Sequence, residues 1–259
     1  MEFEHKDLSD LKKAKKLLEN PGIAAKITNL LGTPIEKGLE LLPDNWNTTI
    51  GEATQAALSK AVQAAVMTMK DSPGKESSDI WHKLAVVTTG SMGGFFGLPA
   101  LAIELPISTT VMLRSIADIA RSEDEPIAQI ESKIACIEVF ALGGPSKGDD
   151  ATESGYFAVR AALAQSITNA TKHIAKNGLI EEGSPALVRL IIKIAERFSI
   201  QVSEKAAAQA IPAIGAAGGA IINTLFIDHF QDMARGHFVV RRLERKYGKK
   251  IVEETYKAI

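Results

Sequence analysis

The chain of 259 residues is 46% hydrophobic and 24% charged, so it can bury a sizeable core and is not disordered throughout. Its formal net charge of -1 argues against a dedicated nucleic-acid binder, because such proteins carry a large basic excess. The only cysteine, Cys136, cannot form a disulfide within the chain, so packing must hold the fold together and a cytoplasmic location fits. The polar, acidic start of the chain predicts no secretory signal.

Apolar residues recur at three-to-four spacing along the chain, whereas strand-type alternation is absent, which predicts an all-α fold. Pro, Gly and Asn residues divide the pattern, and Asp124, Ser154 and Ser184 suit helix N-caps. In chain order we expect helices over residues 8–18, 23–31, 35–42, 50–69, 80–89, 106–122, 126–142, 155–176, 185–198 and 212–247. The fourth of these, 50–69, would be capped by Thr48 or Thr49. We find no dividing linker and expect one structural unit, made of N-terminal helices (1–44) and a helical domain (45–259).

Two segments carry no charge, residues 84–103 and 206–227, and the first is about as long as a bilayer-spanning helix. Glycines four residues apart share one helix face and let another helix approach closely. Such pairs are Gly90 and Gly94, Gly93 and Gly97, and Gly215 and Gly219. Three interpretations are open: buried core helices, reversible insertion into or attachment to a bilayer, and permanent spanning. Pro99, Glu104 and Pro106 interrupt the first segment, which makes permanent spanning the least favoured.

Basic residues gather near both ends of the chain. They are Lys12, Lys13, Lys15 and Lys16 on the first helix, and Arg241, Arg242, Arg245 and Lys246 on the last. Basic segments beside an apolar face are attracted to anionic lipid by about 1 kcal/mol per charge near the surface. The alternative is an ordinary solvated helix face, whose charge Glu244, Glu253 and Glu254 offset.

Charged residues on otherwise apolar helices need partners, because a lone buried ion costs several kcal/mol. Arg114 and Asp118 are four residues apart and can pair on one face, and we expect Glu104 to reach an arginine such as Arg160. A structural ion-pair network is one interpretation of these residues, and a proton-transfer or ligand site is the other.

On the last predicted helix Asp228 and Asp232 share a face, and His229 and His237 are eight residues apart. Carboxylates and imidazoles at such spacings can bind a metal, but nothing resembles the HExxH pattern. The sequence lacks the nucleophile elbow, the P-loop and the dinucleotide fingerprint. Cys136 has the setting of an inert core thiol. We therefore expect neither a metal nor another cofactor and assign no catalytic residue.

Three phrases in order resemble the EcsC family of bacterial proteins. They are Leu98-Pro99 through Ile119-Ala120; Ala141-Leu142-Gly143-Gly144 with Tyr156 and Arg160; and Gly215 to Gly219, Asn223, Phe238 and Arg241 to Gly248. The resemblance covers roughly residues 45–250, so the predicted helical domain would be EcsC-like. It implies an all-helical bacterial domain, and the association of the family's namesake with an ABC transport system implies a link to a membrane. It carries over no catalytic residue, only positions of interest, among them Thr109.

The leading hypothesis is a cytoplasmic accessory protein, peripheral at the inner membrane, whose partner is lipid or a membrane protein and not nucleic acid. The second is an enzyme or a binder of an apolar small molecule, with a polar site between the central helices, and the third is a homo-oligomer. The candidate ligand or network residues are Glu104, Thr109, Arg114, Asp118, Tyr156, Arg160, Asn223, Asp228 and Asp232.

Overall fold

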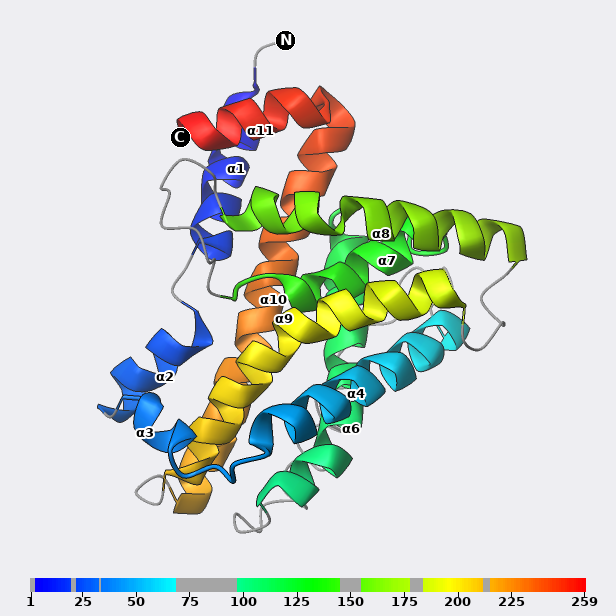
Figure 1. The fold of residues 1–259 in the computed structure, drawn as a ribbon. Coiled ribbons are helices and arrows are strands. Elements are labelled where there is room, and N and C mark those ends of the chain that lie inside the picture. The colour runs from blue at the N-terminus through cyan, green and yellow to red at the C-terminus, as the bar shows by residue number, and fades with distance from the viewer. Residues whose placement is uncertain are drawn as a thin grey trace.

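The computed structural model describes residues 3–19, 22–32, 34–68, 97–144, 155–177, 184–211 and 215–259 (Figure 1). Its elements are α1 (His5–Leu18), α2 (Ile23–Leu31), α3 (Glu36–Leu39), α4 (Trp46–Thr68), α6 (Gly97–Ser122), α7 (Ile130–Glu138), the short 3-10 helix η1 (Val139–Ala141), α8 (Gly155–Asn177), α9 (Pro185–Ala210), α10 (Gly215–Tyr247) and α11 (Lys249–Ala258). These residues contain no strand, so the predicted all-α fold is confirmed.

The longest helix, α10, forms the axis of the fold. It packs against α1, α6, α9 and α11, and α4 crosses both α6 and α9 (Figure 1). In Figure 1 the two chain termini lie with α1 and α11 at the upper end of α10, whereas α6 and α10 both begin at the lower end. The two ends of α10 therefore have different neighbouring elements (Figure 1).

An aromatic cluster fills the core where η1, α9 and α10 meet. Phe140, Phe198 and Phe230 are completely buried, and their ring centroids lie 4.9–5.3 Å apart. Phe226 extends the cluster at 5.2 Å from Phe230. Such tilted and edge-on contacts add to the burial energy of the rings. The cluster fixes the end of η1, and so the turn that follows it, against α10.

The predicted helix over 126–142 begins later than expected, and Asp124 is not its N-cap. Asp124 adopts a left-handed conformation with φ of 56°, and the N–H groups of Asp124 and Glu125 bond to the carbonyls of Arg121 and Ala120. This pair of bonds is the Schellman motif that closes a helix. Asp124 therefore ends α6, and α7 starts only at Ile130.

Other helix boundaries also differ from the expectations. α4 starts at Trp46, before its predicted cap, and α6 starts at Gly97 and continues through Pro106. Packing of α6 along α4 outweighs the one backbone hydrogen bond that a proline removes. α9 continues to Ala210, whereas the Ser184 cap is confirmed by its bond from the N–H of Leu187. The helix α11 was not expected, and the predicted helix 80–89 lies outside the described residues.

The second uncharged segment, 206–227, is divided between two helices. α9 ends at Ala210 and α10 begins at Gly215, so the segment is not one continuous helix. The described part of the first uncharged segment is the start of α6. The glycine pairs in these segments have no described side-chain surroundings, so their predicted packing role stays a prediction.

Candidate functional site

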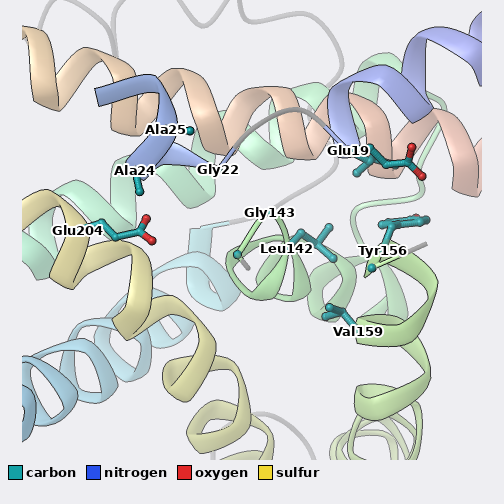
Figure 2. A pocket seen from close by; sticks show the side chains of 12 residues that line it. Glu19, Gly22, Ala24, Ala25, Leu142, Gly143, Tyr156, Val159 and Glu204 are labelled. Carbon is teal, nitrogen blue, oxygen red and sulfur yellow. The ribbon is translucent and has the colours of Figure 1, made fainter. Parts of the chain in front are cut away.

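A pocket of about 400 Å³ lies where the end of α1, the start of α2, the turn after η1, the start of α8 and the last turns of α9 meet (Figure 2). Its polar side chains are Glu19, Tyr156 and Glu204, and four glycines leave the backbone exposed to it. Leu18, Leu142 and other aliphatic residues complete the wall. This size and this mixture of apolar walls with few polar groups are typical of small-molecule sites.

Gly143 forms the floor between the polar side chains (Figure 2). Its φ is +73°, and an added Cβ would lie 2.6 Å from the ring of His229 and 2.8 Å from Sδ of Met233. Only glycine meets both demands, because a side chain is strained at this φ and would collide with α10.

Glu204 extends from α9 toward the start of α2 (Figure 2). Burial raises the pKa of its carboxyl to about 7, although the carboxyl accepts a hydrogen bond from the backbone N–H of Ala24. Desolvation disfavours the charged form more than this single bond favours it. The pocket thus contains a carboxyl group that changes charge near neutral pH.

Glu204→Gln is expected to change how the stability of the protein depends on pH. A raised pKa means that the folded state binds the proton more tightly than the unfolded state does. The stability that Glu204 contributes in this way is complete below about pH 4.5 and is lost as the pH rises through 7. Denaturant unfolding is measured for both proteins at pH 5 and at pH 8. The free energy of unfolding of the variant, relative to that of the wild type, should be higher at pH 8 than at pH 5 by on the order of 2 kcal/mol. An equal difference at both pH values would contradict the raised pKa.

Tyr156 belongs to a buried chain of polar groups behind the pocket. Its hydroxyl lies 3.0 Å from Nδ1 of His237, and Nε2 of His237 lies 3.9 Å from Oε2 of Glu138. Burial raises the pKa of Tyr156 and of Glu138, and burial with the charges of Arg160 and Arg241 holds the pKa of His237 well below its usual value. The three groups are held toward their neutral forms, so Tyr156 is not an activated nucleophile.

Arg160 and Glu244 form a two-fold hydrogen-bonded ion pair between α8 and α10. The distances are 2.7 and 2.9 Å, and both side chains are largely buried. The Arg160 guanidinium also lies 5.3 Å from the ring centre of Tyr156. The predicted Glu104–Arg160 pair is thus wrong, because Nζ of the buried Lys205 binds Glu104 at 2.6 Å instead.

The remaining network candidates are dispersed over the fold. Asp118 pairs with Arg121 and not with Arg114, while the buried hydroxyl of Thr109 has no partner among the described residues. Asn223 accepts a hydrogen bond from Gln209 at 3.5 Å, Asp232 binds Arg235 at 3.0 Å and Lys26 at 3.6 Å, and Asp228 is exposed. Glu104, Arg160 and Asn223, which were expected beside one polar site, each bind a residue outside the predicted set, so the site between their helices stays a prediction.

Glu204 and Lys205 are not among the predicted site residues, because the predicted helix ends at Phe198. The signal for them is the apolar spacing of α9, in which Val202 and Ala206 continue the buried face that Phe198 occupies. A longer helix would have placed both charges beside that buried face.

The basic residues near the C-terminal end of α10 are occupied by carboxylates. Arg241 and Arg245 bind Glu125, Arg242 binds Glu123 and Asp10 at 2.8 and 2.9 Å, and Lys246 binds Glu4 and Asp7 at 2.7 Å. On α1, Lys12, Lys13 and Lys16 are exposed, and Nζ of Lys15 donates to the carbonyl of Tyr256 at 3.0 Å. The exposed lysines of α1 keep the solvated character that attraction to anionic lipid requires.

The opposite end of the molecule exposes large aliphatic side chains. We call the exposed side chains Leu41, Ile107 and Ile221 the apolar end; they are 56%, 45% and 47% exposed. Gln231 on α10 binds Ser115 on α6, and Arg241, ten residues further along α10, binds Glu125, ten residues beyond Ser115. α6 and α10 therefore run in the same direction.

Contacts from α9 and α3 complete this placement. Lys205 binds Glu104, and an added Cβ on Gly38 would lie 2.1 Å from the carbonyl oxygen of Ala207, so α3 packs directly on the end of α9. Ile221 lies about 30 Å along α10 from Arg242, at 1.5 Å per residue. The start of α10 and the arginines near its C-terminal end therefore lie about 30 Å apart, at opposite ends of that helix.

The described ranges of the chain contain neither a ready metal site nor a membrane-spanning helix. Within those ranges no group of three or more His, Cys, Asp or Glu side chains is placed to hold a metal ion. Within the same ranges, no helix has both the length and the apolar character that crossing a bilayer requires.

Comparison with known proteins identifies the family. No curated protein and no solved structure shows a significant match to the chain. The profile of the EcsC protein family matches residues 5–243, which extends the resemblance at residues 45–250 to include the N-terminal helices. Because the match covers most of the sequence, this chain belongs to the EcsC protein family.

Proposed function

We propose that this EcsC protein is a membrane-associated accessory protein whose apolar end attaches to the surface of a lipid bilayer. The observation that carries the proposal is the apolar end itself: Leu41 after α3, Ile107 on α6 and Ile221 near the start of α10 are large aliphatic side chains that are exposed. Large aliphatic side chains that are exposed at one end of a protein often mark an interaction surface. Its place at the inner membrane, in the service of an ABC transport system, is the role that the family resemblance implies and is part of the same proposal.

The attachment rests on burial of apolar side chains and not on charge. The basic residues of α10 are paired with carboxylates, and they lie about 30 Å from the apolar end. Acidic residues such as Glu40, Asp44 and Asp228 are exposed near the apolar end, so anionic lipid offers no gain there. Binding should therefore depend little on lipid charge or salt, in contrast to attraction through the lysines of α1.

Flotation of the full chain with vesicles tests this proposal. Vesicles of neutral phosphatidylcholine and vesicles with added anionic phosphatidylglycerol are each used at low and at high salt. We expect the protein to float with both kinds of vesicle at both salt concentrations. Flotation only with anionic vesicles at low salt would assign the contact to the lysines of α1, and no flotation at all would refute the proposal.

Ile107→Asp and Ile221→Asp should each lower the bound fraction in the same assay. Burying an isoleucine side chain contributes about 1.5–3 kcal/mol, so each change is expected to reduce partitioning at least about tenfold. Val188→Asp is the matched control, because Val188 is an exposed aliphatic residue at the far end of α9. An equal loss in all three variants would show that the apolar end has no special role.

A further inference from the structure

The pocket beside Gly143 has an acidic character that the membrane proposal does not use. Figure 2 shows Glu204 and Glu19 on opposite sides of the pocket, with Gly143 between them. Among the described residues that line it there is no lysine, arginine or histidine. An anionic ligand would meet repulsion from both sides, whereas a cation is favoured at either side.

Glu204 retains unused capacity to accept hydrogen bonds. An ionised carboxylate has about four acceptor positions. In the part of the chain that the structure describes, Glu204 receives one hydrogen bond, from the N–H of Ala24, and no cationic side chain is paired with it. A half-buried carboxylate with one donor gains strongly from a ligand that brings several.

A second acceptor lies behind the glycine wall. His229 is completely buried, and neither of its ring nitrogens has a partner among the described residues. The edge of the ring that carries Cε1 and Nε2 points at Gly143, 2.6 Å from the position where a Cβ would stand. Burial lowers the pKa of His229 to about 4, with a smaller contribution from the charge of Lys26. The ring is therefore neutral, and it places no positive charge behind the wall of the pocket.

We propose that this pocket binds a small organic cation, a primary alkylammonium whose head group is held by Glu204 and whose chain lies along Leu142 and Val159. An ammonium group supplies three N–H donors and one positive charge, which match an under-bonded carboxylate. The aliphatic walls favour an apolar chain over a fully hydrated cation. A bare metal ion fits less well, because the two carboxylates lie on opposite sides of the pocket. The proposal is independent of membrane attachment, since the apolar end contributes no residue to the pocket.

Calorimetric titration of the full chain tests the proposal with three ligands of equal chain length: hexylammonium, neutral 1-hexanol and anionic hexanoate. We expect saturable binding of hexylammonium at pH 8 and binding of the other two that is at least about tenfold weaker. No saturable binding of hexylammonium, or equal binding of the alcohol, would overturn the proposal. Calcium chloride is titrated as well, and binding of calcium in place of the amine would also overturn it.

Variants connect the binding to this pocket. Glu204→Gln should weaken hexylammonium binding at least about tenfold, whereas Glu52→Gln, an exposed change of equal charge on α4, should leave it unchanged. Ala25→Phe, at an exposed lining position, should block the pocket with the fold intact, as checked by circular dichroism. Binding that survives both pocket variants would place the cation elsewhere and contradict the assignment.

Discussion

Glu125→Ala is expected to lower the free energy of unfolding by about 3–5 kcal/mol, because it leaves two arginines without their shared buried carboxylate. The Glu125 side chain is 2% exposed and accepts hydrogen bonds from Arg241 and Arg245 on α10 and from Ser132 on α7 at 3.1 Å. Burial alone would raise the pKa of this carboxyl, but the hydrogen bonds and charge of Arg241 and the charge of Arg245 bring it below its usual value. Glu125 thus joins the turn after α6 to two further helices.

Urea unfolding of the variant and of a control measures this loss. Glu131→Ala removes an exposed carboxylate from the first turn of α7 and should cost no more than about 1 kcal/mol. Arg241→Ala combined with Glu125→Ala should cost less than the sum of the two single changes, because each single change already breaks the same pair. A loss for Glu125→Ala that equals the control would show that the pair contributes little.

Acidification from pH 7.5 to pH 5 is expected to cost the folded protein about 2 kcal/mol through His229 alone. Burial lowers the pKa of this histidine to about 4, whereas in the unfolded chain the value is near 6.5. The unfolded state therefore binds more protons between these two values, so the stability that is present above pH 6.5 is lost as the pH falls toward 4. His237, whose pKa burial also holds well below its usual value, adds to the loss in the same direction.

His229→Leu should remove most of the contribution of His229 to this pH dependence. The difference in unfolding free energy between pH 7.5 and pH 5 is compared for the wild type, for this variant and for His5→Gln, which removes an exposed histidine. The comparison between pH values cancels any packing defect that leucine creates, because such a defect is present at both. An unchanged difference in His229→Leu would show that this imidazole titrates normally in the folded state.

Local sequence signals predicted the helices well but not all of their ends. The apolar spacing and the Ser184 cap locate α9, since both depend on neighbours within one or two turns. Asp124 was misread because aspartate suits an N-cap and also tolerates the left-handed position that closes a helix. Arg241 and Arg245 of α10, more than a hundred residues away, bind Glu125 and so hold the turn in which Asp124 closes α6. No signal near Asp124 in the sequence indicates this contact.

The ion pairs show the limit of spacing arguments more clearly. Arg114 and Asp118 have a favourable spacing, yet Asp118 pairs with Arg121, one position closer on the same face. Glu104 was expected to need a partner and has one, but Lys205 lies 101 residues away and no pattern within one helix can identify it. The pocket has the same origin, because five elements contribute to its wall and packing alone brings them together.

The contact of the apolar end with lipid can be measured residue by residue. Cys136 is completely buried, and burial raises the pKa of its thiol to about 12, so a cysteine introduced at the surface can be labelled alone. An environment-sensitive fluorophore on Ile221→Cys should shift to shorter wavelength when phosphatidylcholine vesicles are added, whereas the same label on Lys16→Cys, at the opposite end, should not respond. A response of the label at position 16 with none at position 221 would contradict the account, and so would silence at both positions.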